Sequence, residues 1–175
     1  MATLWLRTQQ QLITERSAVA AGFAATGVTY ETWDTAQMPA GLSSRSLSDA
    51  EKQLVLTAFG SDIARVSAAK GYKSADVVTL YPDTPNLEVM LAKFDKKHLH
   101  TDDEVRFVVQ GRGVFTLFPD SGIYQGQVID AELHPGDFIT VPANYKHHFV
   151  LSADRQITAI RLFTDVTGWV AHYVP

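Results

Sequence analysis

The first quarter of the chain combines short hydrophobic runs with a helix-like segment. Residues 4–6 are apolar and predict a short strand. Residues 14–25 favour a helix, and Gly27 can provide its left-handed C-terminal cap. Residues 28–33 alternate between apolar and polar side chains, which predicts another strand. Loop-forming residues follow at 38–44, so the next element should begin after them.

A second helix is expected to begin at Ser48 and to run towards Gly71. Ser48 and Glu51 have the spacing of a capping box, which satisfies backbone N–H groups at the start of a helix. The pair Gly60-Ser61 can kink this helix. Its predicted buried side consists of Leu54, Ala58, Phe59, Ile63 and Val66.

From residue 77 onward, short β-rich runs recur with turn-forming Pro, Gly and Asp combinations between them. The predicted strands cover residues 77–81, 90–94, 105–109, 114–118, 127–130, 138–141, 147–151 and 157–163. Many short strands at such spacing favour a sandwich or a barrel. We therefore expect a mainly β fold with N-terminal α/β decoration. A single domain would span residues 1–175, with residues 1–76 packed on a barrel formed by residues 77–175.

Composition restricts the chemistry that this fold can carry. The 175 residues include six histidines and no cysteine, and the formal net charge is -4. We expect no nucleic-acid partner, because a negative protein without long basic runs is repelled by phosphate. The lack of cysteine excludes thiolate ligands and thiol nucleophiles, so any bound metal must be held by histidine and carboxylate. With no apolar run of membrane-spanning length and no signal-peptide pattern, we expect a cytoplasmic protein with no membrane partner.

Two histidines and a glutamate lie close together in residues 98–104. On a strand, His98 and His100 point to the same face, and the polar residues 101–103 can turn the chain so that Glu104 enters from the next strand. Imidazole and carboxylate groups that converge from different segments suit a divalent metal ion. This spacing is expected by chance only about 0.007 times in such a chain. The alternative is a pair of half-exposed strand histidines beside a solvated acidic turn.

A fourth ligand should come from a later strand. The candidates are His134, His147, His148 and His172. His147 and His148 are neighbours on one predicted strand, so only one of them can point inward. His134 precedes a Pro-Gly turn and His172 lies near the C-terminus, so we expect both on the surface.

Two arginines interrupt otherwise apolar strands. Arg106 lies two residues after Glu104 and therefore on the same strand face, and Arg161 interrupts the run 157–163. Each arginine alone could equally form a structural ion pair or be an edge-strand charge. Together with a metal cluster, they look like anchors for an anionic, oxygen-rich ligand, which guanidinium groups bind in bidentate fashion.

These residues resemble the two sequence motifs of the cupin superfamily. The first motif, in its variant with three residues before the glutamate, is matched by His98, His100, Glu104 and Gly111, although its leading glycine is absent. The second motif is matched by Gly136, Pro142 and His147, with Asn144 in place of a glycine and Leu151 in place of the final asparagine. The resemblance implies a cupin double-stranded β-helix, or jelly-roll barrel, and it selects His147 as the fourth ligand. Cupins host many chemistries, so the superfamily alone implies no function.

Further strings are similar to those of the acireductone dioxygenases, the oxygenases of methionine salvage. They occupy residues 100–107, 141–143, 159–163 and 168–171, and the N-terminal segments 27–33, 70–72 and 76–78 agree as well. The resemblance spans nearly the whole chain. Its most specific parts are the strings EVRF and AIRLF, which contain the two arginines.

The family resemblance implies a role for each candidate residue. His98, His100, Glu104 and His147 would bind one Fe(II) or Ni(II) ion per chain. Arg106 and Arg161 would hold the enediolate substrate as catalytic residues, and the substrate pocket would include Phe94, Phe149 and Trp169. Two departures concern the pocket: Lys97 stands where related enzymes often have an acidic residue, and residues 144–148 differ from the usual loop.

The activity that the resemblance implies is cleavage of an acireductone with O2. We expect the protein to be a monomer. The Fe(II) form would yield formate and 4-methylthio-2-oxobutanoate, and the Ni(II) form methylthiopropanoate, formate and carbon monoxide. The sequence does not choose between these metals. Two alternatives remain: another cupin dioxygenase or metal-dependent isomerase that acts on an enediol or diketone, and a non-enzymatic ligand-binding cupin. Oxygen consumption and turnover would distinguish them.

Overall fold

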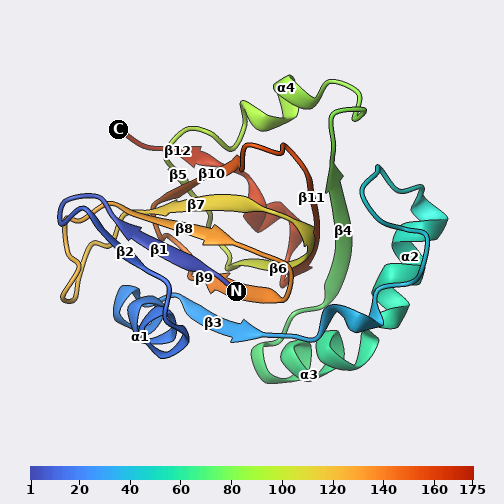
Figure 1. Ribbon diagram of the computed structural model, residues 1–175, viewed down its shortest axis with the longest axis horizontal. Helices are drawn as coiled ribbons and strands as arrows, with labels where there is room; N and C mark the ends of the chain where they lie inside the picture. The colour runs from blue at the N-terminus through green and yellow to red at the C-terminus, as the bar shows by residue number, and fades with distance from the viewer.

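A computed structural model describes the backbone of residues 1–175 and every side chain except that of Val166. The described strands form two antiparallel sheets that face one another (Figure 1). The seven-stranded sheet has the order β12 (His172–Tyr173), β5 (His98–Leu99), β10 (His147–Leu151), β7 (Gly113–Leu117), β8 (Ile129–Leu133), β1 (Thr3–Leu6) and β2 (Gln11–Ile13). The five-stranded sheet has the order β3 (Thr29–Thr32), β9 (Asp137–Val141), β6 (Glu104–Gly111), β11 (Ile157–Phe163) and β4 (Ser74–Leu80). The expected mainly β fold is confirmed.

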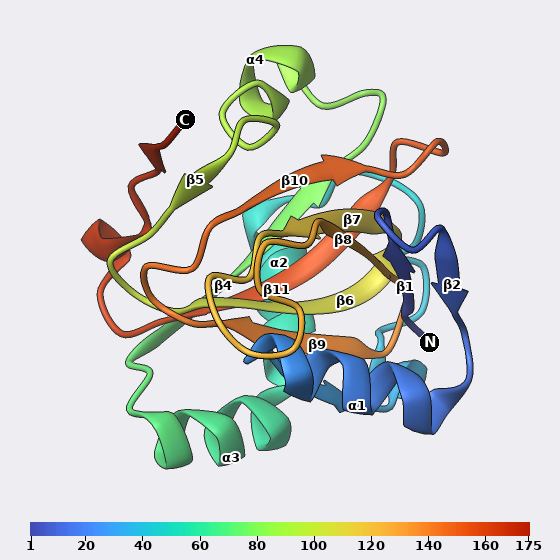
Figure 2. The same ribbon diagram turned by 90° about the vertical axis from the view of Figure 1, so that its left-hand side faces the viewer.

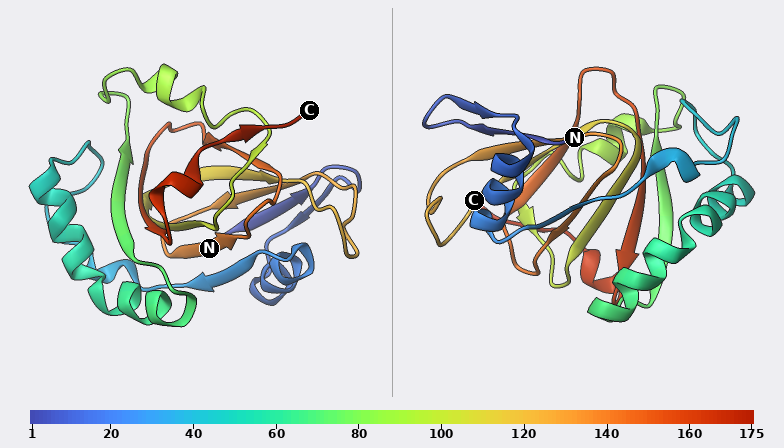
Figure 3. Two further views of the ribbon diagram at one scale, coloured as in Figure 1. Left: turned by 180° about the vertical axis from the view of Figure 1, so that it is seen from behind. Right: turned by 60° about the horizontal axis from the view of Figure 1, so that its bottom comes forward.

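Helices lie on the outside of the two sheets. They are α1 (Arg16–Thr26), α2 (Asp49–Ala58), α3 (Gly60–Lys70) and α4 (Leu87–Leu91), with 3₁₀ turns η1 (Thr35–Gln37) and η2 (Val166–Trp169). Helix α2 packs beside β4 and α1 beside β3, as Figures 1 and 2 show. The C-terminal segment with η2 lies across the barrel, and β12 pairs with β5 (Figure 3, left). In the part of the chain described, no helix is both long and apolar enough to span a membrane.

The three central strands of the five-stranded sheet, β9, β6 and β11, are buried on both faces. One core cluster, which includes Phe115 and Ile139, fills the space between the sheets. A second cluster packs the outer face of this sheet, through residues such as Phe107, against Val55 and Phe59 of the α2–α3 segment. Strands covered on both faces read as continuous apolar runs, which is the pattern of β6, β9 and β11. A charged side chain within these runs therefore needs a specific partner.

The N-terminal predictions are largely confirmed. Strand β1 covers the predicted run 4–6, and β3 lies within 28–33. Helix α1 ends at Gly27, whose φ of 81° is the expected left-handed cap. Because β1 and β2 extend one sheet and β3 the other, we propose that residues 1–76 fold with residues 77–175 as one domain.

The predicted long helix is divided, and one of its predicted buried residues is wrong. The capping box of Ser48 and Glu51 is present, but α2 and α3 are separate helices that meet at Phe59. Leu54 is 55% exposed, whereas its neighbour Val55 is fully buried. The buried face follows Val55, Phe59 and Val66, which have the spacing of one helical stripe.

Among the predicted strands of the C-terminal part, only residues 90–94 are wrong. They form the end of α4 and the turns after it. Leu87, Met90, Leu91 and Phe94 repeat at helical spacing, and all four contact the core cluster between the sheets. The other seven predicted strands are present: β10 and β11 have the predicted bounds, and the other five have shifted ends. The sequence does not predict β2 or β12, because strands of two or three residues carry too little pattern.

Gly111 allows the close approach of two strand ends. Its φ is 72°, and a Cβ at this position would lie 2.0 Å from the carbonyl oxygen of Gln156. We therefore expect Gly111→Ala to lower the free energy of unfolding by about 3 kcal/mol or more, measured by urea denaturation. Gly126→Ala is the matched control: its φ is 73°, but no atom lies within 4 Å of the added Cβ. The control should lose only about 1 kcal/mol, and equal losses in the two variants would contradict the steric argument.

Candidate metal centre

Four of the predicted site residues come together inside the protein. His98 lies on β5 and His100 directly after it, while Glu104 begins β6 and His147 begins β10. Antiparallel pairing of β10 with β5 places His147 directly opposite His98. All four side chains are at most 3% exposed. Residues from three strands therefore form one cluster that is shielded from bulk water.

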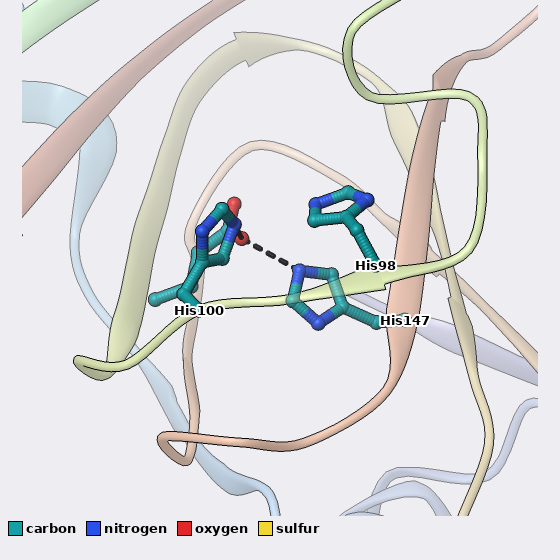
Figure 4. A group of neighbouring side chains, drawn as sticks. His98, His100 and His147 are labelled. Carbon is teal, nitrogen blue, oxygen red and sulfur yellow. Dashed lines mark hydrogen bonds and ion pairs between the residues drawn. The ribbon is translucent and has the colours of Figure 1, made fainter. Parts of the chain in front are cut away.

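The ligand atoms of this cluster converge on one point (Figure 4). One nitrogen of each histidine and one carboxylate oxygen lie within 4.8 Å of one another. The Oε2 atom of Glu104 is 2.7 Å from Nε2 of His147 and 3.1 Å from Nε2 of His100. The imidazole rings of His98 and His147 are 4.6 Å apart between centroids. The three rings thus face each other around the carboxylate.

Backbone carbonyl groups orient all three imidazole rings. The carbonyl partners of Nδ1 are those of Lys96 for His98 (2.6 Å), Val170 for His100 (3.2 Å) and Tyr145 for His147 (2.8 Å). An Nδ1–H that donates to a carbonyl leaves Nε2 as the nitrogen with a free lone pair. Such second contacts are typical of histidines that bind a metal, because they fix both the tautomer and the ring orientation.

The electrostatic environment keeps the donors in the forms that a metal requires. Burial is the main cause that lowers the pKa of His98 to about 4, so this imidazole is neutral near pH 7. Burial alone would raise the pKa of Glu104, but Arg106, His147 and His100 outweigh it and hold that pKa well below its ordinary value. Glu104 is therefore a carboxylate, and the buried imidazole of His98 is a neutral ligand.

The donor spacing fits one divalent metal ion. Two donors that each lie about 2.1 Å from one ion at right angles are about 3.0 Å apart. The contacts of 2.7 and 3.1 Å from Glu104 to the two histidines are close to this value. Three imidazoles and one carboxylate also leave room for further ligands in an octahedral site, as in metal centres that bind a substrate directly.

Arg106 and Arg161 lie side by side next to the cluster. They are directly opposite each other on the paired strands β6 and β11. Nε and Nη2 of Arg106 both lie 2.9 Å from Oε1 of Glu104, and Nη1 is buried without a partner among the described residues. Arg161 forms a bidentate ion pair with Asp76 on β4. Arg106 thus borders the candidate metal centre directly, and Arg161 lies beside Arg106 on the neighbouring strand.

A narrow cavity adjoins the two arginines. Its volume is about 30 Å³, and apart from Arg106 and Arg161 its lining is apolar. Phe94 and Phe149, two of the predicted pocket residues, belong to this lining. The space holds about one water molecule, so a larger ligand requires neighbouring side chains to move. Phe94 and Arg161 also line an outer groove.

Trp169 covers the site from the C-terminal segment. Its ring centroid is 5.9 Å from that of His100, and it also lies 4.9 Å from the guanidinium carbon of Arg106 and 5.5 Å from that of Arg161. Trp169 lines the outer groove rather than the inner cavity. The third predicted pocket residue therefore lies over the two arginines and one of the histidines.

Sequence reasoning missed three acidic residues that hold parts of the site. The sequence predicts only a turn at residues 101–103. In the structure, Asp102 accepts hydrogen bonds from the N–H groups of Thr164 and Asp165, and Asp103 accepts from Tyr72 and Ala143. The third is Asp76, the partner of Arg161. Adjacent acids between two ligand-bearing strands are the one signal that could have revealed Asp102 and Asp103.

The remaining histidines lie apart from the cluster. His148 points to the opposite side of β10 from His147, and its ring centroid is 5.9 Å from that of Phe118. His172 is exposed, as expected, and His134 is partly exposed, with 26% of its side-chain surface accessible. These positions leave His147 as the fourth member of the cluster.

At both departures from the family pattern, the structure shows a specific contact. Lys97 directs its ammonium group to the ring of Phe118, 5.3 Å from the centroid. Asn144 replaces the glycine of the motif and has a φ of 63°, a left-handed conformation that asparagine tolerates better than most residues. Its N–H donates to the carbonyl oxygen of His100 over 2.7 Å. Asn144 therefore connects the loop before His147 to the segment that bears the other two histidines.

Comparison with known proteins agrees with this site. The sequence profile of the ARD/ARD' family matches residues 34–171. The chain belongs to this family. A protein named acireductone dioxygenase from Exiguobacterium sibiricum is 44% identical over 99% of this chain and 95% of its own length. Another of that name, from Bacillus cereus, is 47% identical over 84% of this chain and 85% of its own.

A solved structure of the family shares the whole architecture. It is described as an acireductone dioxygenase from Bacillus anthracis with a cadmium ion in its active centre. The two chains are 42% identical, the TM-score is 0.92, and the match covers 99% of this chain and 98% of the other. The predicted cupin barrel is thereby confirmed. The buried cluster of histidines and Glu104 supports a metal-binding site in this chain as well.

Proposed function

We propose that this protein is a metal-dependent dioxygenase that cleaves an acireductone with O2 in methionine salvage. The observation that carries the proposal is the buried cluster of His98, His100, Glu104 and His147 next to two arginines. Membership of the family and relatives named acireductone dioxygenase over nearly the full chain support it. An acireductone loses its acidic hydroxyl protons readily, so the arginines match its charge.

The cluster of three histidines and Glu104 would hold Fe(II) or Ni(II). A bound ion would supply Lewis-acid activation of the substrate for reaction with O2. The carbonyl groups behind each ring keep the Nε2 atoms aimed at one point, so these three nitrogens would hold the ion together with Glu104. Glu104 supplies one negative charge and also holds Arg106, so it joins the cluster to the anion-binding side.

Arg106 and Arg161 would bind the oxygens of the ionised enediol. The buried and unpartnered Nη1 of Arg106 is a donor that an anionic oxygen can satisfy. Phe94 and Phe149 would pack against the apolar part of the substrate and keep water out of the cavity. Trp169 would cover both arginines from the groove side. A single chain supplies every one of these residues, so we propose that the monomer is active.

The experiment combines metal analysis with turnover of a synthetic acireductone. The purified protein should contain about one transition-metal ion per chain. It should consume O2 with the substrate, lose this activity after chelation and regain it with Fe(II) or Ni(II). Carbon monoxide among the products would identify the reaction proposed for nickel, and its absence with formate present would identify that proposed for iron. Metal-free protein, or metal-loaded protein without O2 consumption, would refute the proposal.

A further inference from the structure

Two positive charges lie directly opposite each other on neighbouring strands. Arg106 on β6 and Arg161 on β11 form a cross-strand pair, and both line the same cavity. Like charges in such a pair repel and destabilise the sheet. Arg106 is buried and cannot move away from this repulsion. The side chain of Arg161 is 24% exposed and borders the outer groove, so it has a route to water.

A carboxylate holds each arginine by the same edge of its guanidinium group. Glu104 accepts a hydrogen bond from Nε of Arg106, and Nη2 of Arg106 lies 2.9 Å from the same carboxylate oxygen. Asp76 accepts from the same two atoms of Arg161, with Nε 2.6 Å from Oδ1 and Nη2 bonded to Oδ2. In both cases the opposite edge, which carries Nη1, is left for another acceptor. Strand pairing fixes this arrangement, because Asp76 lies opposite Arg161 in the pair of β4 with β11.

We propose that Asp76 is a positioning residue, which holds Arg161 with its free edge beside that of Arg106, so that both arginines bind one oxygen-rich dianion. This inference rests on the proposed function, because it assigns a role in binding the enediolate substrate. Asp76 does not line the cavity and acts only through Arg161. Without Asp76, repulsion from Arg106 would favour conformations of Arg161 that extend into the groove.

The direction of the change in KM distinguishes a positioning role of Asp76 from a purely electrostatic effect of its charge. Removing a negative charge near an anion site strengthens anion binding by Coulomb's law alone. A positioning role predicts the opposite result, because a displaced Arg161 no longer meets the ligand. For Asp76→Asn we expect KM for the synthetic acireductone to rise about 10- to 100-fold with little change in kcat. Asp76→Glu keeps the charge and should restore part of the lost affinity.

The matched control is Asp130→Asn. Asp130 also forms a bidentate pair across a sheet, with Nε and Nη2 of Arg7, but this pair lies outside the barrel. The control should leave KM and kcat unchanged. The metal content and the thermal midpoint of Asp76→Asn should stay close to those of the wild type, since a partly exposed ion pair contributes little stability.

A double-mutant cycle tests whether Asp76 acts through Arg161. In an Arg161→Met background, Asp76→Asn should no longer raise KM. An unchanged or lower KM in the single variant, or an equal rise in both backgrounds, would overturn the inference. If Asp76→Asn does not fold, the cycle is run with Asp76→Glu, and the same comparison applies. Wild-type protein without turnover would instead refute the proposed function, so the two failures are distinguishable.

Discussion

Replacing Glu104 by glutamine should abolish both metal binding and turnover. The change keeps the size of the side chain but removes the one negative charge that faces His100 and His147. It also removes the charge that compensates Arg106, which is only 8% exposed. We expect the metal content of the purified variant to fall to a few per cent and turnover to fall at least about 1000-fold. Elemental analysis and O2 consumption measure the two effects.

The same substitution should destabilise the protein. Removing one partner of a buried ion pair costs about 3–5 kcal/mol, because the other charge remains without compensation. Glu132→Gln is a suitable control, since Glu132 also lies on a barrel strand and accepts a hydrogen bond, from Ser152. Its side chain is 32% exposed, and we expect normal metal content and activity. A Glu104→Gln variant with full metal content would show that this carboxylate is not a ligand.

Three of the four cluster residues could be predicted because they lie close together in the sequence. His98 and His100 share one strand face, and a polar turn of three residues separates them from Glu104. A period of two and a turn are enough to bring these side chains together. The assignment of His147 as the fourth ligand required the family motif. Strand periodicity shows that one of His147 and His148 points inward, but it does not show which one. The structure places His147 opposite His98, a pairing across 49 residues of sequence that no local pattern contains.

The features that sequence reasoning missed depend on contacts between distant segments. Asp76 matters because β4 pairs with β11, which brings it to Arg161. Asp102 binds the backbone of residues 164–165, and so fixes the segment that carries Trp169. The sequence predicts a strand at residues 90–94, where the structure has the end of α4, because a five-residue window hides the helical repeat that begins at Leu87. Turns and apolar runs can be read from the local sequence. The contacts of Asp76 and Asp102 depend on which distant segments the fold brings together.

A pair of neighbouring histidines offers a direct test of which side of β10 faces the proposed metal. His147 is 1% exposed and its Nε2 lies 2.7 Å from Glu104. His148 points to the opposite side, beside Phe118. Both substitutions to glutamine remove an imidazole from the same strand, so their effects on strand propensity should be equal.

We expect His147→Gln to lose metal and activity and His148→Gln to keep both. Loss of a hydrogen bond to a metal-ligating side chain already lowers metal affinity about 10- to 100-fold. Loss of the ligand itself should therefore lower metal affinity at least about 100-fold. Titration of the metal-free variants with Ni(II) measures the affinities, and O2 consumption measures the activity. His148→Gln should change the free energy of unfolding by less than about 1 kcal/mol, because His148 is only partly buried. If both variants bound Ni(II) as the wild type does, the assignment of His147 as a ligand would be wrong. If only His148→Gln lost the metal, His148 and not His147 would be the ligand.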